Sequence, residues 1–381
     1  MKILAIETSC DETGISLVEG KKESGSFTFS VLKNALLSQA LLHSPYGGVY
    51  PNLAKREHQK YLPVLFEQFK DDEYDAIAVT TGPGLEPALW TGITFAEALA
   101  KETSKPLFPI NHMEGHLISS LTQNGVLENV ALPVLGLLIS GGHTEFVLMK
   151  NWFEYELVGQ TLDDAVGEAF DKVARTLGLP YPGGPQISKL AEENRSGAKR
   201  VDASIAQGDA PSIANFQQEI TRASGGSVLR SNFKLPRPMI NENSCDVSFS
   251  GLKTSVLYAV RDMGGVQTLS TQEVARFAQE FEDAVADVLI SKTKRALHET
   301  NARTMVLGGG VAANVHLRKV IAEAVAKEFP EVEFRLPDTS ITGDNAIMIA
   351  EAALARVLSE KISPATEPIV ARGNLSLSSS V

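Results

Sequence analysis

Short apolar runs alternate along the chain with segments whose apolar residues recur at helical spacing. The apolar runs have the length of strands and cover residues 2–6, 15–18, 76–80, 107–110, 133–139, 145–149 and 304–307. The helical spacing covers residues 53–69, 92–101, 162–177, 270–297 and 347–357. Strands that alternate with amphipathic helices are typical of α/β proteins, in which helices cover the faces of a sheet. A chain of 381 residues is long for one core, so we expect two lobes.

Several of the predicted strands end in turns built from small residues. The first such turn joins the first two strands over residues 7–14, and a second joins the strands at 133–139 and 145–149. Turns of this kind can aim several backbone N–H groups into one concavity, where a phosphate binds. An ordinary hairpin turn is an equal alternative for the first of them. A third strand is followed by three glycines at 308–310, which let a flat ligand lie on bare backbone, although a linker would have the same composition.

Two histidines, His112 and His116, lie four residues apart just after a predicted strand. Side chains at this spacing share one face of a helix, so both imidazoles can bind one metal ion. Two ligands do not complete a metal site, and the rest must come from elsewhere in the chain. Zinc proteases use His-Glu-x-x-His, whereas Glu114 lies two residues from each histidine and about 200° around the helix from both. The spacing therefore argues against a metalloprotease.

Acidic residues gather in the helix predicted at 162–177. Asp164, Glu168 and Asp171 would share one face of this helix, where a purely structural helix usually pairs acids with Lys or Arg. Arg175 can pair with Asp171, so a structural role remains an alternative to a functional one.

The C-terminal part of the chain has two further features. Asp344 precedes the helix predicted at 347–357, and a carboxylate at this position is most simply interpreted as a helix cap. The tail from residue 362 to 381 contains Ser and Pro, and we expect it to be poorly ordered.

Composition and charge narrow the functional classes. Hydrophobic residues make up 43% of the chain and charged residues 21%, which is ordinary for a soluble protein. The formal net charge of −11 argues against a protein that coats nucleic acid with its overall field, but it permits a local basic patch. Only two cysteines occur, which fits a reducing compartment. No apolar run approaches the roughly 18 residues of a membrane span, and the N-terminus lacks the zones of a signal peptide, so we expect a cytoplasmic protein.

Residues 195–238 differ in character from the rest of the chain. This stretch is rich in Ser, Ala, Gly and Gln, and it contains seven basic residues against three acidic ones. The basic residues are Arg195, Lys199, Arg200, Arg222, Arg230, Lys234 and Arg237. Positive charge concentrated in an acidic chain indicates contact with a phosphate backbone. A surface insertion with incidental charge explains the composition equally well.

Eight short motifs, met in order along the chain, resemble the TsaD family. They are residues 6–14, 112–116, 138–144, 167–172, 181–185, 249–254, 308–314 and 344–346, which read IETSCDETG, HMEGH, LISGGHT, GEAFDK, YPGGP, FSGLKT, GGGVAAN and DNA. The bacterial branch of the family fits best, because residues 236–239 read PRPM and no transit segment precedes the first strand.

The resemblance implies an α/β, two-lobed ATPase fold like that of actin, sugar kinases and Hsp70, with mixed sheets and flanking helices. Residues 1–125 with 344–360 would form the first lobe, residues 130–340 the second, and residues 361–381 a tail. The resemblance also implies an acyltransferase acting on tRNAs that read codons beginning with A. It would move the threonylcarbamoyl group from threonylcarbamoyl-AMP to N6 of adenine 37, forming t6A and releasing AMP.

The same motifs imply a metal site and a substrate site. One divalent metal ion per subunit, usually iron and sometimes zinc, would be bound by His112, His116 and Asp344. The substrate would contact Leu138, Ile139, Ser140, Gly141, Gly142, Asp171, Gly184 and Asn314. Asp11 is our candidate for the general base, because it lies on the first of the small-residue turns.

Partners also follow from the resemblance. They are tRNA, threonylcarbamoyl-AMP, an inactive paralogous subunit (TsaB-like) and a P-loop ATPase subunit (TsaE-like), with no membrane involved. A small-molecule kinase of the same fold is the alternative function. It would explain the glycine turns but would leave His112 and His116 without a role.

Overall fold

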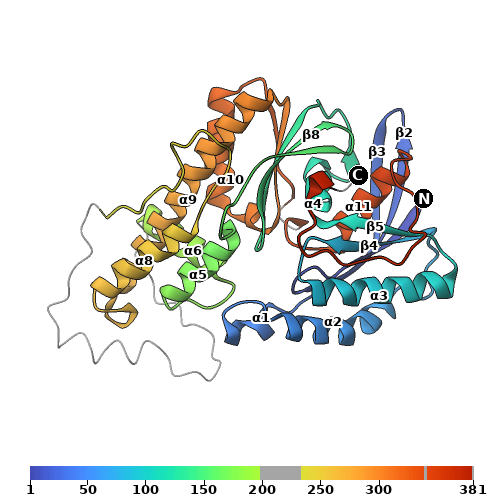
Figure 1. Ribbon diagram of the computed structural model, residues 1–381, viewed down its shortest axis with the longest axis horizontal. Coiled ribbons are helices and arrows are strands. Elements are labelled where there is room, and N and C mark those ends of the chain that lie inside the picture. The colour runs from blue at the N-terminus through green and yellow to red at the C-terminus, as the bar shows by residue number, and fades with distance from the viewer. Residues whose placement is uncertain (198–232, 339–340, 380–381) are drawn as a thin grey trace.

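Two mixed β-sheets lie side by side in the structure, a computed structural model that describes residues 1–197, 233–338 and 341–379 (Figure 1). The first sheet has the strand order β5-β4-β1-β2-β3-β6 and the second the order β11-β10-β7-β8-β9. The strands of the first sheet are β1 (Lys2–Glu7), β2 (Glu12–Glu23), β3 (Ser26–Ser38), β4 (Ala76–Gly82), β5 (Leu107–Asn111) and β6 (Val126–Leu127). Those of the second sheet are β7 (Val134–Ile139), β8 (Thr144–Asn151), β9 (Glu154–Gln160), β10 (Thr304–Gly308) and β11 (Glu333–Arg335).

Helices cover both faces of the first sheet. They are α1 (Ala40–His43), α2 (Pro51–Phe66), α3 (Glu86–Thr103), α4 (His112–Leu121) and α11 (Ala346–Val357), with the short helix η1 (Ser44–Tyr46) after α1. Helices α2 and α3 lie on one face of this sheet (Figure 1). There Leu62 of α2 and Leu89 of α3 are buried in one cluster with Ile6 of β1 and Val79 of β4. β1 and β2 form the predicted antiparallel hairpin, while β4 and β5 run parallel to β1, so the carboxyl ends of these three strands meet at one edge.

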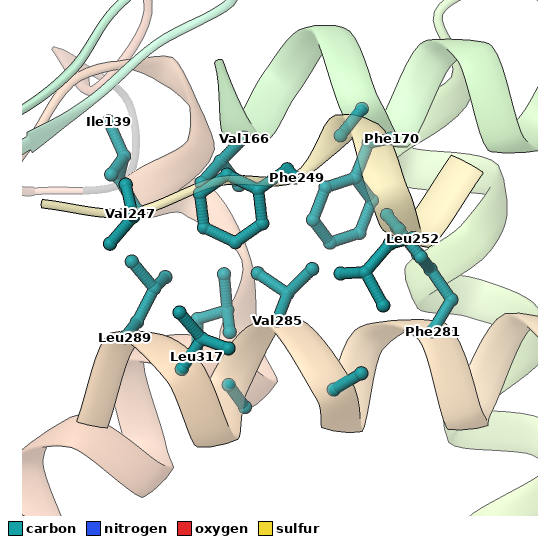
Figure 2. Close-up of a cluster of buried hydrophobic side chains, with 14 of the residues drawn as sticks. Ile139, Val166, Phe170, Val247, Phe249, Leu252, Phe281, Val285, Leu289 and Leu317 are labelled. Carbon is teal, nitrogen blue, oxygen red and sulfur yellow. The ribbon is translucent and has the colours of Figure 1, made fainter. Parts of the chain in front are cut away.

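A second group of helices packs on the second sheet. They are α5 (Val166–Thr176), α6 (Gly183–Ser196), α8 (Ser250–Asp262), α9 (Thr271–Thr300) and α10 (Val315–Glu328), with the short helices η2 (Val266–Thr268) and η3 (Gly310–Ala313). Figure 2 shows Val285 and Phe281 of α9 pointing toward Phe170 and Phe249, and the rings of Phe170 and Phe281 meet edge to face at 5.0 Å. A capping box between Ser270 and Glu273 marks the start of α9.

Two helices, α4 and α11, connect the cores of the two sheets. A single buried cluster contains Met113 of α4 and Met348 of α11 together with residues of β1, β7 and β10. Because this cluster touches both sheets, the position of α4 relative to the second sheet is determined by packing. Among the described residues, no helix is long and apolar enough to cross a membrane.

Two helices begin at residues other than those predicted. Helix α5 begins at Val166 because the preceding turn is held in another conformation, in which the Asp163 carboxylate accepts a hydrogen bond from Phe249 N at 2.8 Å. Helix α3 begins earlier than predicted, at Glu86, and Pro87 occupies its first turn, where the fixed φ of proline suits a helix.

The prediction of a poorly ordered tail is wrong for residues 361–379. This segment lies along the edge of the first sheet, where Ala365 N donates to Leu107 O at 2.8 Å. Ile369 and Leu377 are buried, and the segment ends in the short helix η5 (Leu377–Ser379). The edge strand β5 offers backbone acceptors, and the apolar residues of the tail cover it.

Candidate metal centre

The two histidines lie in the first turns of α4, at the carboxyl end of β5. The helix begins at His112 because the Asn111 side chain caps it, accepting a hydrogen bond from Met113 N at 2.8 Å. One helical turn separates the two imidazoles, whose ring centroids are 4.7 Å apart and nearly perpendicular. Both side chains are buried, so their free nitrogens need partners inside the protein.

Asp344 reaches these histidines from the far end of the chain. One of its oxygens, Oδ1, lies 3.1 Å from His116 Nε2 and 3.4 Å from His112 Nε2. The helix-capping role predicted for Asp344 belongs instead to Asn345, whose side chain accepts from Met348 N at 3.1 Å. Because the next residue caps α11, the Asp344 carboxylate is left to face the imidazoles.

The three side chains form a group that can bind one metal ion. A ligand atom from each lies within 4.8 Å of the other two. Two imidazoles and one carboxylate are a donor set that iron and zinc both accept, with coordination positions left for other ligands. The residues therefore fit the metal that the sequence predicts.

The charges of the group are strongly coupled. Burial disfavours a charged imidazole, but Asp344 and Glu7 nevertheless raise the pKa of His112 to about 10. Burial lowers the pKa of His116, and burial of Asp344 is outweighed by His112 and His116, which hold its pKa well below the usual range.

Glu7, which the sequence analysis did not single out, orients one of the histidines. Its Oε2 lies 3.2 Å from His112 Nδ1, the ring nitrogen that faces away from Asp344. Ser9 N and Thr80 Oγ1 donate to the same carboxylate, so Glu7 is fixed in place. A carboxylate behind a ligating histidine is a common arrangement in metal sites. The sequence feature that could have indicated this role is that Glu7 is an acidic residue at the end of the buried strand β1, which runs parallel to β4 and β5.

Glu114 is committed to other partners. Arg356 Nε lies 2.8 Å from both oxygens of the Glu114 carboxylate, and Tyr155 donates its hydroxyl to one of them. Glu114 is buried on the side of α4 that packs against α11. The expectation that Glu114 does not serve a metal is consistent with these contacts.

The small-residue turn after β7 lies beside the metal centre. A Cβ on Gly308 would stand 3.2 Å from His116 O and one on Gly309 would stand 2.4 Å from Ile139 O, so the ends of β7 and β10 lie against α4. Burial and the positive charge of His112 lower the pKa of His143 in this turn to about 4. Added Cβ atoms on Gly141 or Gly142 would meet nothing within 4 Å, which leaves room for a ligand against the backbone. Leu138 and Ile139 are fully buried in the cores, so they can contact a ligand only through backbone atoms.

The remaining residues predicted to contact the substrate lie in or next to three helices that pack on the second sheet. Asp171 of α5 accepts from Gly183 N at 2.7 Å, and its pKa is raised by burial and by nearby Asp11. Gly184, at the start of α6, has open space beside its Cα. Asn314 caps α10 and donates to Glu282 Oε1 at 2.7 Å, so its side chain is already engaged.

The acidic face predicted around α5 is largely neutralised. Lys172 Nζ lies 2.7 Å from Asp164 and 2.6 Å from Glu168. The Asp171 carboxylate accepts from Gly183 N instead of pairing with Arg175. The structural interpretation of Asp164 and Glu168 is therefore favoured.

Basic residues at both ends of the 195–238 stretch are paired with acids of α9. Arg195 binds Glu282 and Asp283. Arg237 binds Glu280 and Asp287, and Lys234 also lies against Glu280. Helix α9 therefore supplies counter-charges to these three residues, and contact of the stretch with a phosphate backbone stays a prediction. The other basic residues, Lys199, Arg200, Arg222 and Arg230, lie outside the described residues.

Comparison with solved structures supports the fold. Full-length HypF, in a phosphate- and nucleotide-bound crystal structure, matches with a TM-score of 0.50 and 12% identity over 94% of this chain and 46% of that chain. HypF from T. kodakarensis matches with a TM-score of 0.48 and 14% identity over 95% of this chain and 48% of that chain. This chain therefore spans about half the length of those proteins. At such low identity the first of these similarities shows the fold alone.

Comparison with protein families is more specific. A family model described as TsaD, tRNA N6-adenosine threonylcarbamoyltransferase, matches residues 30–351. The match covers well over half of the chain and includes the paired histidines, the small-residue turns that follow the strands at 133–139 and 304–307, and Asp344. The expected two mixed sheets with flanking helices are also present. The chain belongs to the TsaD family of tRNA-modifying transferases.

Proposed function

We propose that this protein transfers a threonylcarbamoyl group from threonylcarbamoyl-AMP to N6 of adenine 37 in tRNAs that read codons beginning with A. Membership of the TsaD family supports a transferase that acts on tRNA. The observation that carries the proposal is the position of the three possible metal ligands beside the small-residue turns, because a Cβ on Gly308 would stand 3.2 Å from His116 O and one on Gly309 would stand 2.4 Å from Ile139 O. A turn suited to a phosphate and a group suited to a metal ion therefore meet, as a reaction at an acyl phosphate requires.

The proposed reaction exchanges one bond to the carbamoyl carbon for another. N6 of adenine attacks this carbon, the bond from the carbon to the phosphate oxygen breaks, and AMP leaves while N6 loses a proton. Gly141 and Gly142 would hold the phosphate through backbone N–H groups, because there is open space beside both residues. Asp11 would accept the proton, since it lies in the buried turn close to Asp171.

We propose iron as the metal, with zinc as the second choice, held by His112, His116 and Asp344. When bound, the ion supplies a Lewis acid that polarises a carbonyl oxygen. The protein contributes the fixed positions of the ligands, which Asn111 and Glu7 establish.

The proposed setting is that of the bacterial members of the family. An inactive paralogous subunit (TsaB-like) and a P-loop ATPase subunit (TsaE-like) would act together with this chain in the cytoplasm. The threonylcarbamoyl-AMP would be supplied by a separate enzyme that activates the acyl group.

Reconstitution of the reaction tests the proposal. Purified protein, its two proposed partners, threonylcarbamoyl-AMP and unmodified tRNA are incubated, and t6A is measured by mass spectrometry of the digested RNA. We expect t6A with the native protein, and its loss with His112→Ala or His116→Ala. The matched control is His298→Ala, since His298 is exposed and packs on Phe329 away from the metal centre.

Two outcomes would contradict the proposal. Absence of t6A with the native protein would refute the reaction, and full activity in both histidine variants would refute the role of the metal centre. The role of Asp11 is tested separately by Asp11→Asn, which keeps the shape of the side chain and removes its basicity. An unchanged kcat in this variant would exclude Asp11 as the general base.

A further inference from the structure

Two exposed tyrosines stand next to the first sheet, in a segment to which the proposed reaction gives no role. Tyr46 closes η1 and Tyr50 precedes α2, and their rings stack with centroids 5.7 Å apart at an angle of 24°. Their exposed fractions are 61% and 51%, which is high for large aromatic residues. A stacked pair of aromatic rings that remains open to solvent can accept a further planar group.

A cavity of about 280 Å³ adjoins this pair and lies between the two groups of helices. Tyr46 and Gly47 line it on one side, and Asp171, Arg175 and Tyr181 line it on the other. One water occupies roughly 30 Å³, so the cavity can take a group much larger than a water molecule. Asp171, which lines the cavity, is also one of the residues predicted to contact the substrate, so the cavity adjoins the proposed substrate site.

Arg175 brings a positive charge to the cavity. Its aliphatic stem lies against Gly47, where an added Cβ would stand 3.3 Å from Arg175 Cδ. The side chain is exposed, and it has no acidic partner among the residues that the structure describes. A guanidinium in this situation can bind a phosphate or stack on a base.

Buried hydrogen bonds hold the tyrosine segment in place. Tyr50 N donates to His43 Nδ1 at 3.2 Å, and His43 Nε2 lies 3.3 Å from Gln39 Oε1. The amide of Gln39 lies 3.3 Å from His58 Nδ1, and the opposite ring nitrogen of His58 lies 3.0 Å from Cys10 O. One tautomer satisfies every contact, because each histidine then accepts at Nδ1 and donates at Nε2. The chain of contacts joins Tyr50 to the turn that contains Asp11.

This connection makes the tyrosines part of a rigid arrangement. Burial lowers the pKa of both His43 and His58, so both rings are neutral, as the hydrogen bonds require. Buried polar groups that are all paired stabilise one conformation. A surface segment that served only to link α1 to α2 would not need such support.

We propose that Tyr46, Tyr50 and Arg175 form a docking platform for an unpaired base of the RNA substrate and its phosphate, next to the adenine that is modified. The inference rests on the proposed function, because it assumes an RNA substrate. Proteins bind unpaired RNA bases by stacking them on aromatic rings and on Arg. An acidic chain cannot hold RNA by its overall field, so it needs local contacts of this type.

A fluorescent RNA hairpin tests the platform. The probe carries 2-aminopurine in the unpaired loop beside the acceptor adenine, and it is titrated with the full chain and its two proposed partners at fixed salt. Stacking on a tyrosine quenches this base. We expect Tyr46→Ala and Tyr50→Ala to reduce the quenching and to weaken RNA binding by between about fivefold and a hundredfold. Tyr46→Phe and Tyr50→Phe should retain both.

Arg175 and a distant tyrosine complete the design. Arg175→Ala should reduce the slope of log affinity against log salt by about 0.7, the value for one contact to a single-stranded phosphate. Tyr258→Ala is the matched control, because Tyr258 is 51% exposed but lies on α8 and contacts Arg261. It should change neither the quenching nor the affinity. Thermal unfolding of each variant shows whether the fold is intact.

The outcomes separate this inference from the proposed function. Normal RNA affinity and quenching in folded Tyr46→Ala and Tyr50→Ala variants would refute the platform, even if the native protein forms t6A. Loss of association with a partner protein, seen by light scattering while RNA binding is unchanged, would also refute it and identify a protein interface. Quenching that depends on both tyrosines, in a native protein that makes no t6A, would support the platform and refute the proposed reaction.

Discussion

At the scale of single residues, hydrogen-bond partners decide which carboxylates serve the metal centre. Glu114 lies between the two histidines in the sequence, but Arg356 and Tyr155 occupy its oxygens. Asp344 lies more than 200 residues away and faces both imidazoles, because Asn345 caps the following helix in its place. Side-chain chemistry alone does not distinguish these carboxylates, whereas their contacts do.

Glu7 should influence metal affinity without touching the metal. In Glu7→Gln the charge behind His112 is lost, so the imidazole becomes a weaker and less firmly oriented ligand. We expect metal affinity to fall by about 10- to 100-fold, measured by competition with a chromogenic chelator. Glu57→Gln is the control, since Glu57 is another buried glutamate but pairs with Arg56 and Lys60 on α2. Equal affinities in the native protein and Glu7→Gln would contradict this role.

At the scale of elements, the close contact between α4 and α11 brings the metal ligands together. Gly115 allows this approach, because an added Cβ would stand 3.1 Å from both Met348 Cγ and Ile349 Cδ1. The Glu114–Arg356 ion pair joins the same two helices on the side away from the metal centre. Both apolar packing and an ion pair therefore stabilise the contact between α4 and α11.

Glu351, buried in this interface, should make stability depend on pH. Burial raises its pKa from 4.5 to about 7, against a lowering effect of the Ser119 and Thr122 hydroxyls. The unfolded chain therefore loses its proton at lower pH than the folded protein, and stability falls as pH rises between these two values. Glu351→Gln stays neutral, so above the folded pKa it should be more stable than the native protein by up to about 3 kcal/mol.

Urea unfolding at about pH 4 and about pH 8 measures this difference. The advantage of Glu351→Gln should appear only at the higher pH. Glu192→Gln, on the exposed side of α6, is the control and should show no such difference. An equal effect of Glu351→Gln at both pH values would contradict the prediction.

Helix α5 positions the small-residue turn after β7. A Cβ on Gly167 would stand 2.6 Å from Ser140 O and 2.8 Å from Gly141 Cα, so Gly167→Ala must displace the turn. A displacement of this order should lower kcat/KM for threonylcarbamoyl-AMP by about 100-fold. Gly251→Ala, which has only Pro238 Cγ at 3.9 Å, is the matched control. Steady-state kinetics measure kcat/KM for threonylcarbamoyl-AMP in both variants. An unchanged kcat/KM in Gly167→Ala would show that the turn takes no part in binding.

At the scale of the whole molecule, the two sheets share a core. The cluster that contains α4 and α11 also contains residues of β7 and β10, and Tyr155 of β9 reaches Glu114 of α4. The division into lobes at about residues 125 and 344 therefore stays a prediction, since buried contacts cross it. Motion of one sheet relative to the other would have to break these contacts.

The net negative charge of the whole molecule makes local basic residues important for tRNA binding. We expect two kinds in the 195–238 stretch, namely residues that contact tRNA and residues that pair with acids of α9. Neutralising Arg222 and Arg230, which lie outside the described residues, should weaken tRNA binding and reduce its salt slope by about 0.7 to 0.9 per residue. Arg237→Ala should leave the slope unchanged and lower the melting temperature, because buried Glu280 loses one of its two basic partners. Filter binding over a series of salt concentrations measures the slope. A smaller slope in Arg237→Ala, or an unchanged one in Arg222→Ala with Arg230→Ala, would contradict the assignment.

The sequence by itself determined the local features of this protein. Strands such as β1, β4 and β7 and helices such as α2 and α9 were predicted close to their positions, because period-two and period-3.6 patterns reflect contacts within one element. The strands β3 and β9 were not predicted. Two further features depend only on residues within one element. They are the helix α4, which presents His112 and His116, and the capping box of α9. The eight motifs indicated the family, which the match over residues 30–351 confirmed.

Only the tertiary structure decided how distant residues are paired. Glu7 behind His112, Arg356 on Glu114 and the acids of α9 on Arg195 all join segments far apart in the chain. Each side chain has several chemically suitable partners in the sequence, and packing of the elements selects one of them. The same holds for the tail, whose position depends on the exposed edge of β5. The metal ligands could be predicted from motifs, while the residues that hold and surround them required the fold.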